Sequence, residues 1–140
     1  MQQVLVVGKG GVKKVFVASG LRYDMILSDA LCGEDYLREI VAHHVSGQLK
    51  VAPEHTENNV LDLMGKPRPD SLLKFKDRFD RLSHAAGKPQ FLTYYIIAAH
   101  PGCTAQDMVR LKSFTTEKLR VNPEQVQIFT PTPSTYASLM

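Results

Sequence analysis

Residues 91–99 read F-L-T-Y-Y-I-I-A-A, a run that is nearly all apolar or aromatic and is the strongest strand signal in the chain. Such residues favour strands, and a strand without polar alternation is typical of a parallel sheet that helices cover on both faces. Pro101 and Gly102 break the run. The run therefore predicts a buried strand of an α/β domain.

Extended and helical patterns alternate on both sides of this run. Further strands are predicted at Lys14–Ala18, Gln48–Ala52 and Gln125–Phe129. Helical spacing of apolar residues predicts helices at Glu34–Val45, about Glu57–Met64, about Ser71–Ala86 and from Thr104 onward. Three helix ends have expected signals. One helix has Thr56 as an N-cap and Gly65 at its C-terminal end, and the next helix start has Thr104 with Asp107 as an acidic capping box.

Strands that alternate with helices imply crossover connections and a mostly parallel sheet. The predicted fold class is α/β, with four mostly parallel β/α units. The 140 residues suit a single domain over 1–140, and no linker or internal boundary interrupts them.

Composition excludes several classes of protein. The net charge of +3 is too small to indicate nucleic acid or an anionic membrane as a partner. No apolar run reaches the roughly 18 residues of a transmembrane helix, and from the residues given we expect no signal peptide. The two cysteines, Cys32 and Cys103, cannot form a disulfide framework or a three-cysteine cluster site. We expect a cytoplasmic protein.

Polar residues follow all four predicted strands. Ligands of parallel α/β sheets bind beyond the carboxyl ends of the strands, so these residues form the candidate site. The residues in these positions are Ser19, Gly20, Arg22, Asp24, Glu54, His55, His100, Pro101, Gly102, Thr130 and Thr132.

Other site chemistries fit these residues less well. His55 and His100 could bind zinc or iron with Glu54 and Asp24, but no tight ligand spacing occurs. We therefore favour a role as loop residues or as hydrogen-bond partners of an organic ligand. A phosphate loop at residues 8–14 lacks its Gly-Lys-Ser/Thr end and precedes a strand. Cys103 stands at a helix N-terminus, which lowers a thiol pKa, yet a small residue in a turn explains it more simply.

Three segments resemble the radical S-adenosylmethionine enzymes. Residues 49–66 contain L-K-V-A-P-E-H-T and then V-L…M…K-P, which is similar to the family's Glu-Ser-Gly-like turn and its following helix. Residues 99–108, A-H-P-G-C-T-A-Q-D-M, look like its Gly-x-Pro-Gly-Glu-Thr…Asp segment. Residues 129–135, F-T-P-T-P-S-T, look like its Tyr-Thr-Pro-x-Pro-Gly-Thr segment.

The YgiQ-type subfamily is the closest resemblance within that family. Residues 15–24 and the pair His43-His44 add to the match, which covers about residues 12–140 and leaves residues 1–11 poorly matched. The resemblance implies a partial TIM-like barrel made of the later four β/α units.

The resemblance also implies two cofactors, S-adenosylmethionine and a 4Fe-4S cluster. The cluster of such enzymes is held by Cys-x-x-x-Cys-x-x-Cys, and it reduces S-adenosylmethionine to methionine and a deoxyadenosyl radical. This chain has no such motif, so we expect the cluster-binding half to lie elsewhere in a complete protein. We therefore expect a fragment that is inactive alone, with no catalytic residue assigned and no metal ligand of its own.

By resemblance, the cofactor-binding residues lie on the S-adenosylmethionine side of the barrel. Ser19, Arg22, Glu54 and His55 are expected near the ribose and the methionyl group, where Glu54 could meet an ammonium and Arg22 a carboxylate. The adenine side is expected to be lined by His100, Gly102 and Thr130.

Two other functions remain open. One is a small-ligand or nucleotide-binding α/β domain without chemistry. The other is an interaction module, because the open edges of half a barrel favour self-association. The substrate cannot be read from these residues.

Overall fold

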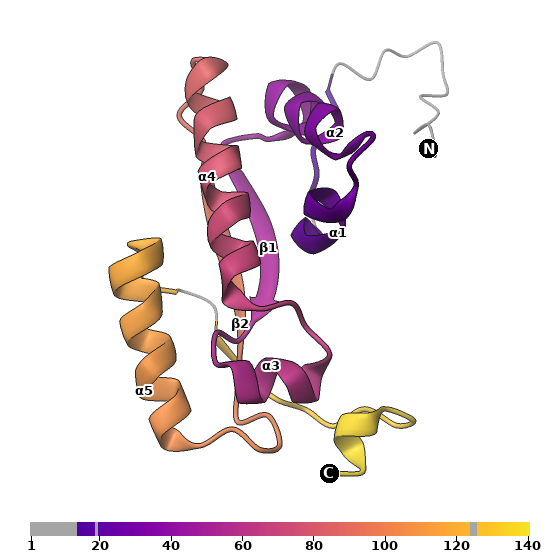
Figure 1. Ribbon diagram of the computed structural model, residues 1–140, viewed down its shortest axis with the longest axis vertical. Helices are drawn as coiled ribbons and strands as arrows, with labels where there is room; N and C mark the ends of the chain where they lie inside the picture. Colours follow the sequence, from indigo (N-terminus) through magenta and orange to yellow (C-terminus); the bar gives the residue numbers. More distant parts are fainter. Residues whose placement is uncertain (1–13, 19, 124–125) are drawn as a thin grey trace.

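The computed structural model describes residues 14–18, 20–123 and 126–140. Its centre is a parallel sheet of three strands in the order β1 (Gln48–Glu54), β2 (Phe91–Ala98) and β3 (Val126–Ile128). Helices occupy both connections between the strands, as parallel pairing requires (Figure 1). The α/β class and the parallel sheet are thus confirmed.

Five α-helices are found in the described part of the chain. They are α1 (Tyr23–Ser28), α2 (Gly33–Glu39), α3 (Asn58–Met64), α4 (Pro69–Ala85) and α5 (Ala105–Phe114). The helices α2 and α5 continue into π-helical turns, η1 (Ile40–His44) and η2 (Thr115–Leu119), and a short 3-10 turn, η3 (Tyr136–Ser138), lies near the C-terminus.

The core lies between the sheet and the helices on one of its faces. Alternate residues of β1 and β2 are buried there, and α4 runs along these two strands (Figure 1). Phe75 and Phe79 of α4 are fully buried in the same cluster as residues of α1, α2 and α5. Burial of one such ring contributes about 1.5–3 kcal/mol. On the other face the side chains stay partly exposed, and Phe91 is 57% exposed.

Most predicted elements are confirmed. The structure contains β1, β2 and β3 at the predicted places, and α3 and α4 begin and end within two residues of their predicted bounds. The predicted helix Glu34–Val45 is α2 with η1, and the capping box of Thr104 and Asp107 is present at the start of α5.

Two expectations about local structure are wrong. Residues 14–18 form no strand; among the described residues before β1, Leu21 forms an isolated parallel bridge with Val51. The residue that caps α3 is Glu57, while Thr56 is buried. In addition, residues Tyr23–Ser28, for which no element was predicted, form α1. The described chain therefore contains three strands where four were predicted, and a partial barrel stays a prediction.

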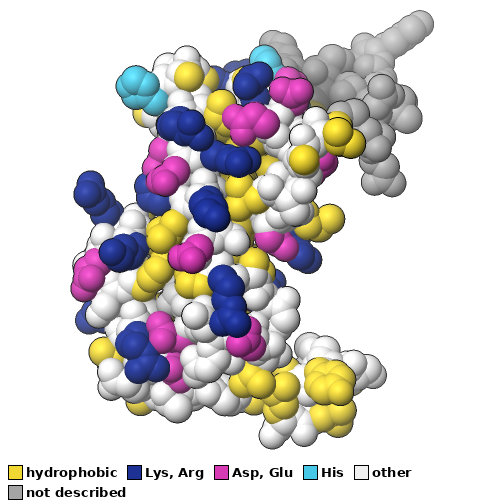
Figure 2. All heavy atoms as spheres, in the orientation of Figure 1, with side chains coloured by type: hydrophobic (Ala, Val, Ile, Leu, Met, Phe, Trp, Pro, Cys, Tyr) yellow, Lys and Arg dark blue, Asp and Glu magenta, His cyan; other side chains and the backbone are white. Residues whose placement is uncertain are grey.

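The sheet has an edge at β3 where all three residues are exposed, including Ile128 at 76%. Unpaired edges recruit other strands, so the predicted self-association concerns this edge, and sedimentation at rising protein concentration tests it. Cations and anions are mixed on the face shown in Figure 2. Ion pairs such as that of Arg78 with Glu34 link α4 to α2. Among the described residues, no helix combines the length and the apolar character needed to span a bilayer.

Candidate functional site

The candidate site lies at the carboxyl ends of β1 and β2, which are neighbours in the sheet. A residue in the left-handed region stands at each strand end: Glu54, the last residue of β1, has φ +66°, and Ala99, directly after β2, has φ +58°. Each of these residues precedes a buried histidine, His55 or His100. Non-glycine residues rarely adopt this conformation, and such strain concentrates at functional sites. The chain therefore turns sharply at both strand ends and directs two imidazoles inward.

Glu54 is one half of an ion pair at this edge. Its carboxylate lies 2.8 Å from Lys66 Nζ, and both side chains are only about one-fifth exposed. Lys66 follows α3, whose C-terminal Gly65 adopts φ +62° and so redirects the chain toward the strand end. Lys66 belongs to the motif in residues 49–66 that resembles the radical S-adenosylmethionine enzymes. Its contact with Glu54 was not predicted from the sequence.

A second ion pair joins Arg22 and Asp24 at the start of α1. The guanidinium donates to both carboxylate oxygens, with distances of 2.9 Å from Nε and 2.7 Å from an Nη atom. These hydrogen bonds lower the pKa of Asp24 and raise that of Arg22, which Glu54 raises further by its negative charge. Burial raises the pKa of Tyr23 to about 12, with help from Asp24 and Glu54. The structure thus brings Arg22 and Glu54, two predicted site residues, into one electrostatic environment.

His55 is almost completely buried, at 1% exposure, and both its ring nitrogens have partners. Nδ1 accepts from the backbone N–H of Glu57 at 3.0 Å, and Nε2 lies 3.5 Å from Cys103 Sγ. Burial lowers the His55 pKa, and the neighbouring His100 lowers it further. The negative charges of Glu57 and Asp107 act in the opposite direction but do not outweigh burial. The imidazole is therefore neutral at physiological pH, and it joins the loop after β1 to the loop after β2.

Cys103 is held as a neutral thiol. Burial raises its pKa first, and the charge of Asp107 raises it further, although a backbone hydrogen bond at Ala99 acts in the opposite direction. The lowering expected from a helix N-terminus is therefore wrong, because the Asp107 carboxylate occupies that helix end. A protonated thiol is a poor nucleophile at neutral pH.

Asp107 is the centre of a polar network that fastens α5 to α3. Its carboxylate accepts from the Thr104 N–H and hydroxyl at 2.8 and 2.7 Å and pairs with Arg110. Arg110 also donates to Glu57 at 2.6 Å, and Asn59 donates to Asp107 at 3.4 Å. The Thr104 hydrogen bonds, first of all, lower the Asp107 pKa to about 2. The two helices are thus locked beside the strand ends.

The remaining predicted site residues differ in their burial and in their contacts. The His100 ring packs edge-on against Phe129 with centroids 4.9 Å apart, and its Nδ1 lies 2.9 Å from the Pro101 oxygen. Thr130 follows Phe129 but is exposed, with its hydroxyl 3.5 Å from a backbone oxygen of β3. Gly102 is exposed yet lies close to Leu63 of α3. Ser19 lies outside the described residues.

The thiols of this chain do not fit an iron-sulfur cluster. Such a cluster needs three or four thiolates, whereas Cys32 is exposed between α1 and α2 and Cys103 contacts His55. Throughout the described ranges no three His, Cys, Asp or Glu side chains are grouped as a metal site. The contacts of His55 also favour the hydrogen-bonding role, because a metal needs a ring nitrogen lone pair and Nδ1 already accepts from Glu57.

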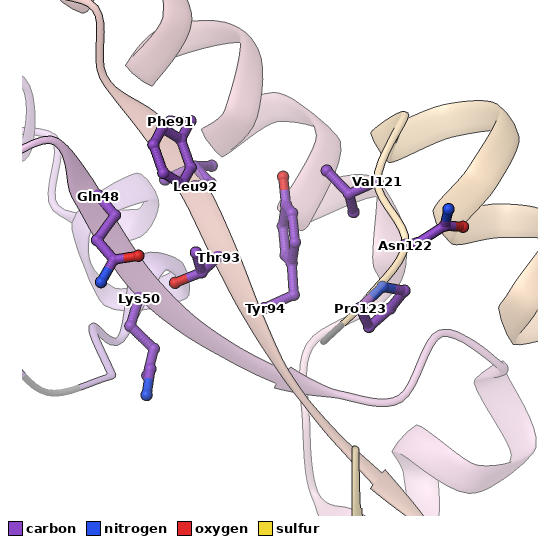
Figure 3. Close-up of a pocket in the computed structure, with 9 residues that line it drawn as sticks. All are labelled: Gln48, Lys50, Phe91, Leu92, Thr93, Tyr94, Val121, Asn122 and Pro123. Carbon is purple, nitrogen blue, oxygen red and sulfur yellow. The ribbon is translucent and has the colours of Figure 1, made fainter. Parts of the chain in front are cut away.

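A cavity of about 300 Å³ lies at the opposite end of the strands. Figure 3 shows Gln48, Lys50 and Thr93 on one side of β2, and Tyr94 with Val121 on the other. Gln48 begins β1, whereas Glu54 ends it, so this cavity is separate from the candidate site.

The chain is similar to segments of longer proteins. It is 60% identical over 129 residues to a UPF0313 protein of Fusobacterium nucleatum, a match that covers 92% of the chain and 23% of that protein. It is 46% identical to a UPF0313 protein of Clostridium perfringens and 44% identical to one of Methanosarcina mazei. Each of these matches covers 93% of the chain. The chain spans about a fifth of the length of these curated relatives. No protein-family model and no solved structure match it.

Proposed function

We propose that this chain is part of a radical S-adenosylmethionine enzyme and supplies the face that holds the methionyl end of S-adenosylmethionine. The observation that carries the proposal is the charge arrangement at the carboxyl edge, where Glu54 pairs with Lys66 close to Arg22 and Asp24. An amino acid ligand carries one ammonium and one carboxylate. Its ammonium can replace Lys66 beside Glu54, and its carboxylate can replace Asp24 beside Arg22. The sequence resemblance supports the same ligand.

The charges suit the two ends of the ligand. The Glu54 carboxylate accepts hydrogen bonds from the ligand ammonium, a role that Lys66 fills in the structure. Arg22 is the more exposed partner of its pair and presents a planar fork that matches a carboxylate in two hydrogen bonds. Lys66, once released from Glu54, offers a second cation for the same carboxylate. Ligand binding is thus an exchange of partners among charges already present.

The adenosine end would lie toward His100 and Gly102. Both are next to the sharp turn at Ala99, and His100 is buried against Phe129. An aromatic and imidazole surface suits a nucleobase, which has an apolar face and polar edges. S-Adenosylmethionine would supply the radical chemistry, but the cysteines here hold no cluster, so the proposal assigns this chain a binding role.

Calorimetric titration of the chain with S-adenosylmethionine tests the proposal. We compare the wild type with Glu54→Gln, and we use Asp80→Asn as a matched control because Asp80 forms a surface pair with Lys76 on α4. A hydrogen bond between charged groups is worth about 1.5–3 kcal/mol, so Glu54→Gln should weaken binding by about tenfold or more.

Two further ligands separate the alternatives. 5′-Methylthioadenosine keeps the nucleoside and lacks the amino acid, so its affinity should be the same for wild type and Glu54→Gln. The proposal is wrong if millimolar S-adenosylmethionine does not bind, or if Glu54→Gln and Asp80→Asn bind it equally well. Comparable binding of ATP would favour a general nucleotide-binding domain.

A further inference from the structure

The contact between His55 and Cys103 joins two loops that are distant in sequence. His55 belongs to the loop after β1, and Cys103 to the loop after β2, with the two atoms Nε2 and Sγ 3.5 Å apart. The Cys103 thiol also lies 3.6 Å from the backbone oxygen of Thr104, its other hydrogen-bond partner. Because His55 is buried and Cys103 partly buried, little water competes for these contacts.

The direction of each hydrogen bond follows from the backbone donor. The N–H of Glu57 can only donate, so His55 Nδ1 must accept and carries no proton. A neutral imidazole then carries its proton on Nε2, which faces Cys103. The sulfur accepts from Nε2–H, and its own proton is directed to the Thr104 oxygen. The geometry thus selects one tautomer and places Cys103 in the role of acceptor.

We propose that His55 and Cys103 are positioning residues, which hold the strand-end turn so that the Glu54 carboxylate faces Lys66. Glu54 directly precedes His55 and has a positive φ, a strained conformation that persists only when neighbouring contacts fix it. The Cys103 contact anchors the residue immediately after the strained one. The ligand-binding measurement described below rests on the proposed function, whereas the spectroscopic measurements on His55, Glu54 and Lys66 do not.

The neighbouring contacts do not replace this anchor. Glu57 and Asp107 are joined through Arg110, which fixes α3 to α5, but these bonds begin three residues after Glu54. The contacts of Glu54 itself are its register pairing with Ile96 of β2 and the ion pair of its side chain with the flexible Lys66. Removal of the sulfur should therefore leave the His55 ring held only by the Glu57 N–H and loosen the Glu54 turn, while α3 and α5 stay in place.

Imidazole ¹⁵N spectra near neutral pH test the first step. Wild-type His55 should show one tautomer, with a protonated Nε2 and an unprotonated Nδ1. Cys103→Ala removes only the acceptor of Nε2–H, because the Glu57 N–H still holds Nδ1 unprotonated, so the tautomer should persist while the Nε2 nitrogen and proton shifts move. Cys103→Ser keeps an acceptor in place and should leave the Nε2 shifts close to those of the wild type. Cys32→Ser is the matched control, because Cys32 is an exposed free cysteine.

The second step is read from Glu54 and from the ligand. Cys103→Ala should shift the Glu54 carboxyl and Lys66 ammonium resonances and weaken S-adenosylmethionine binding about tenfold, whereas Cys103→Ser should retain most of the affinity. A Cys103→Ala protein with wild-type shifts at His55 Nε2–H overturns the proposal. So does one in which these shifts move but the Glu54 and Lys66 resonances do not change. If the wild type binds no S-adenosylmethionine, the proposed function fails, and the Glu54 and Lys66 resonances still decide the positioning role.

Discussion

Alanine at position 102 should destabilise the protein through two separable effects. Gly102 has φ +82°, and a Cβ atom built on it would lie 2.4 Å from Cδ1 of Leu63 in α3. Gly87 provides the comparison, because it has φ +64° and a Cβ there would meet nothing within 4 Å. The two positions share the backbone cost and differ in the steric contact.

The left-handed conformation costs an alanine about 1–2 kcal/mol at either position. At position 102, overpacking adds about 1 kcal/mol, the low end of the usual range. The low end applies because Leu63 is 42% exposed and can turn toward solvent. We therefore expect Gly87→Ala to lower the free energy of unfolding by about 1–2 kcal/mol and Gly102→Ala by about 2–3 kcal/mol.

Urea unfolding followed by circular dichroism measures both free energies, provided that the slopes of the transitions are equal. Leu63→Ala and the double variant Gly102→Ala/Leu63→Ala complete a double-mutant cycle. We expect a coupling energy of about 1 kcal/mol, because the shorter side chain makes room for the new Cβ. The reasoning is refuted if the two glycine variants lose equal stability, or if the effects of Gly102→Ala and Leu63→Ala simply add.

Three further predictions concern pH, capping and the core. The buried His55, which faces Glu57, Asp107, His100 and Cys103, has a lowered pKa, so the unfolded chain takes up its proton first. Stability should fall as the pH drops below about 6.5, and urea midpoints of His55→Gln should fall less steeply there. Asp107→Asn should lower stability near neutral pH, because a neutral amide accepts more weakly from Thr104 and loses the charge pair with Arg110. Because the Asp107 pKa is about 2, its contribution is present above the unfolded value near 4 and is lost toward pH 2, where wild type and variant should converge. Phe75→Ala should cost about 3–5 kcal/mol in thermal unfolding, and a loss below about 1 kcal/mol would contradict its place in the core.

Sequence patterns predicted the elements whose signals are local. The apolar run at 91–99 predicted β2, and the pair Thr104 and Asp107 predicted the start of α5, because three-residue spacing is a property of the helix end itself. The helix α1 was missed, because it has six residues, no side-chain cap and only two buried side chains, Tyr23 and Ile26. So short a helix leaves too little periodicity to detect.

The strand predicted at 14–18 failed for a different reason. Its residues have high strand propensity, but propensity describes how well a side chain suits a sheet and not whether a partner strand is available. Among the described residues before β1, Leu21 bridges to Val51 at the strand's edge, and the segment before Leu21 bonds to η1 through the Val17 N–H and the His44 oxygen.

The candidate site was predicted in its location and not in its contacts. Parallel topology alone places Glu54, His55 and His100 at one edge of the sheet, as the structure shows. The pairs Glu54–Lys66 and His55–Cys103 depend on two sharp turns and on the packing of α3 against α5. These features arise from tertiary structure, so no spacing in the sequence signals them.

The parallel sheet also has a consequence for how this chain folds. Leu49 must pair with Leu92, and Ile97 with Gln127, so every ladder joins segments separated by at least one helix. The entropy of closing these long loops is paid before any strand pairing compensates for it, which slows folding relative to a helical bundle. During synthesis on a ribosome, β1 has no partner strand until β2 has emerged. Over that period the apolar residues of β1 are exposed to other chains. The rate of synthesis between these two strands is therefore expected to influence how much of the protein reaches its native state.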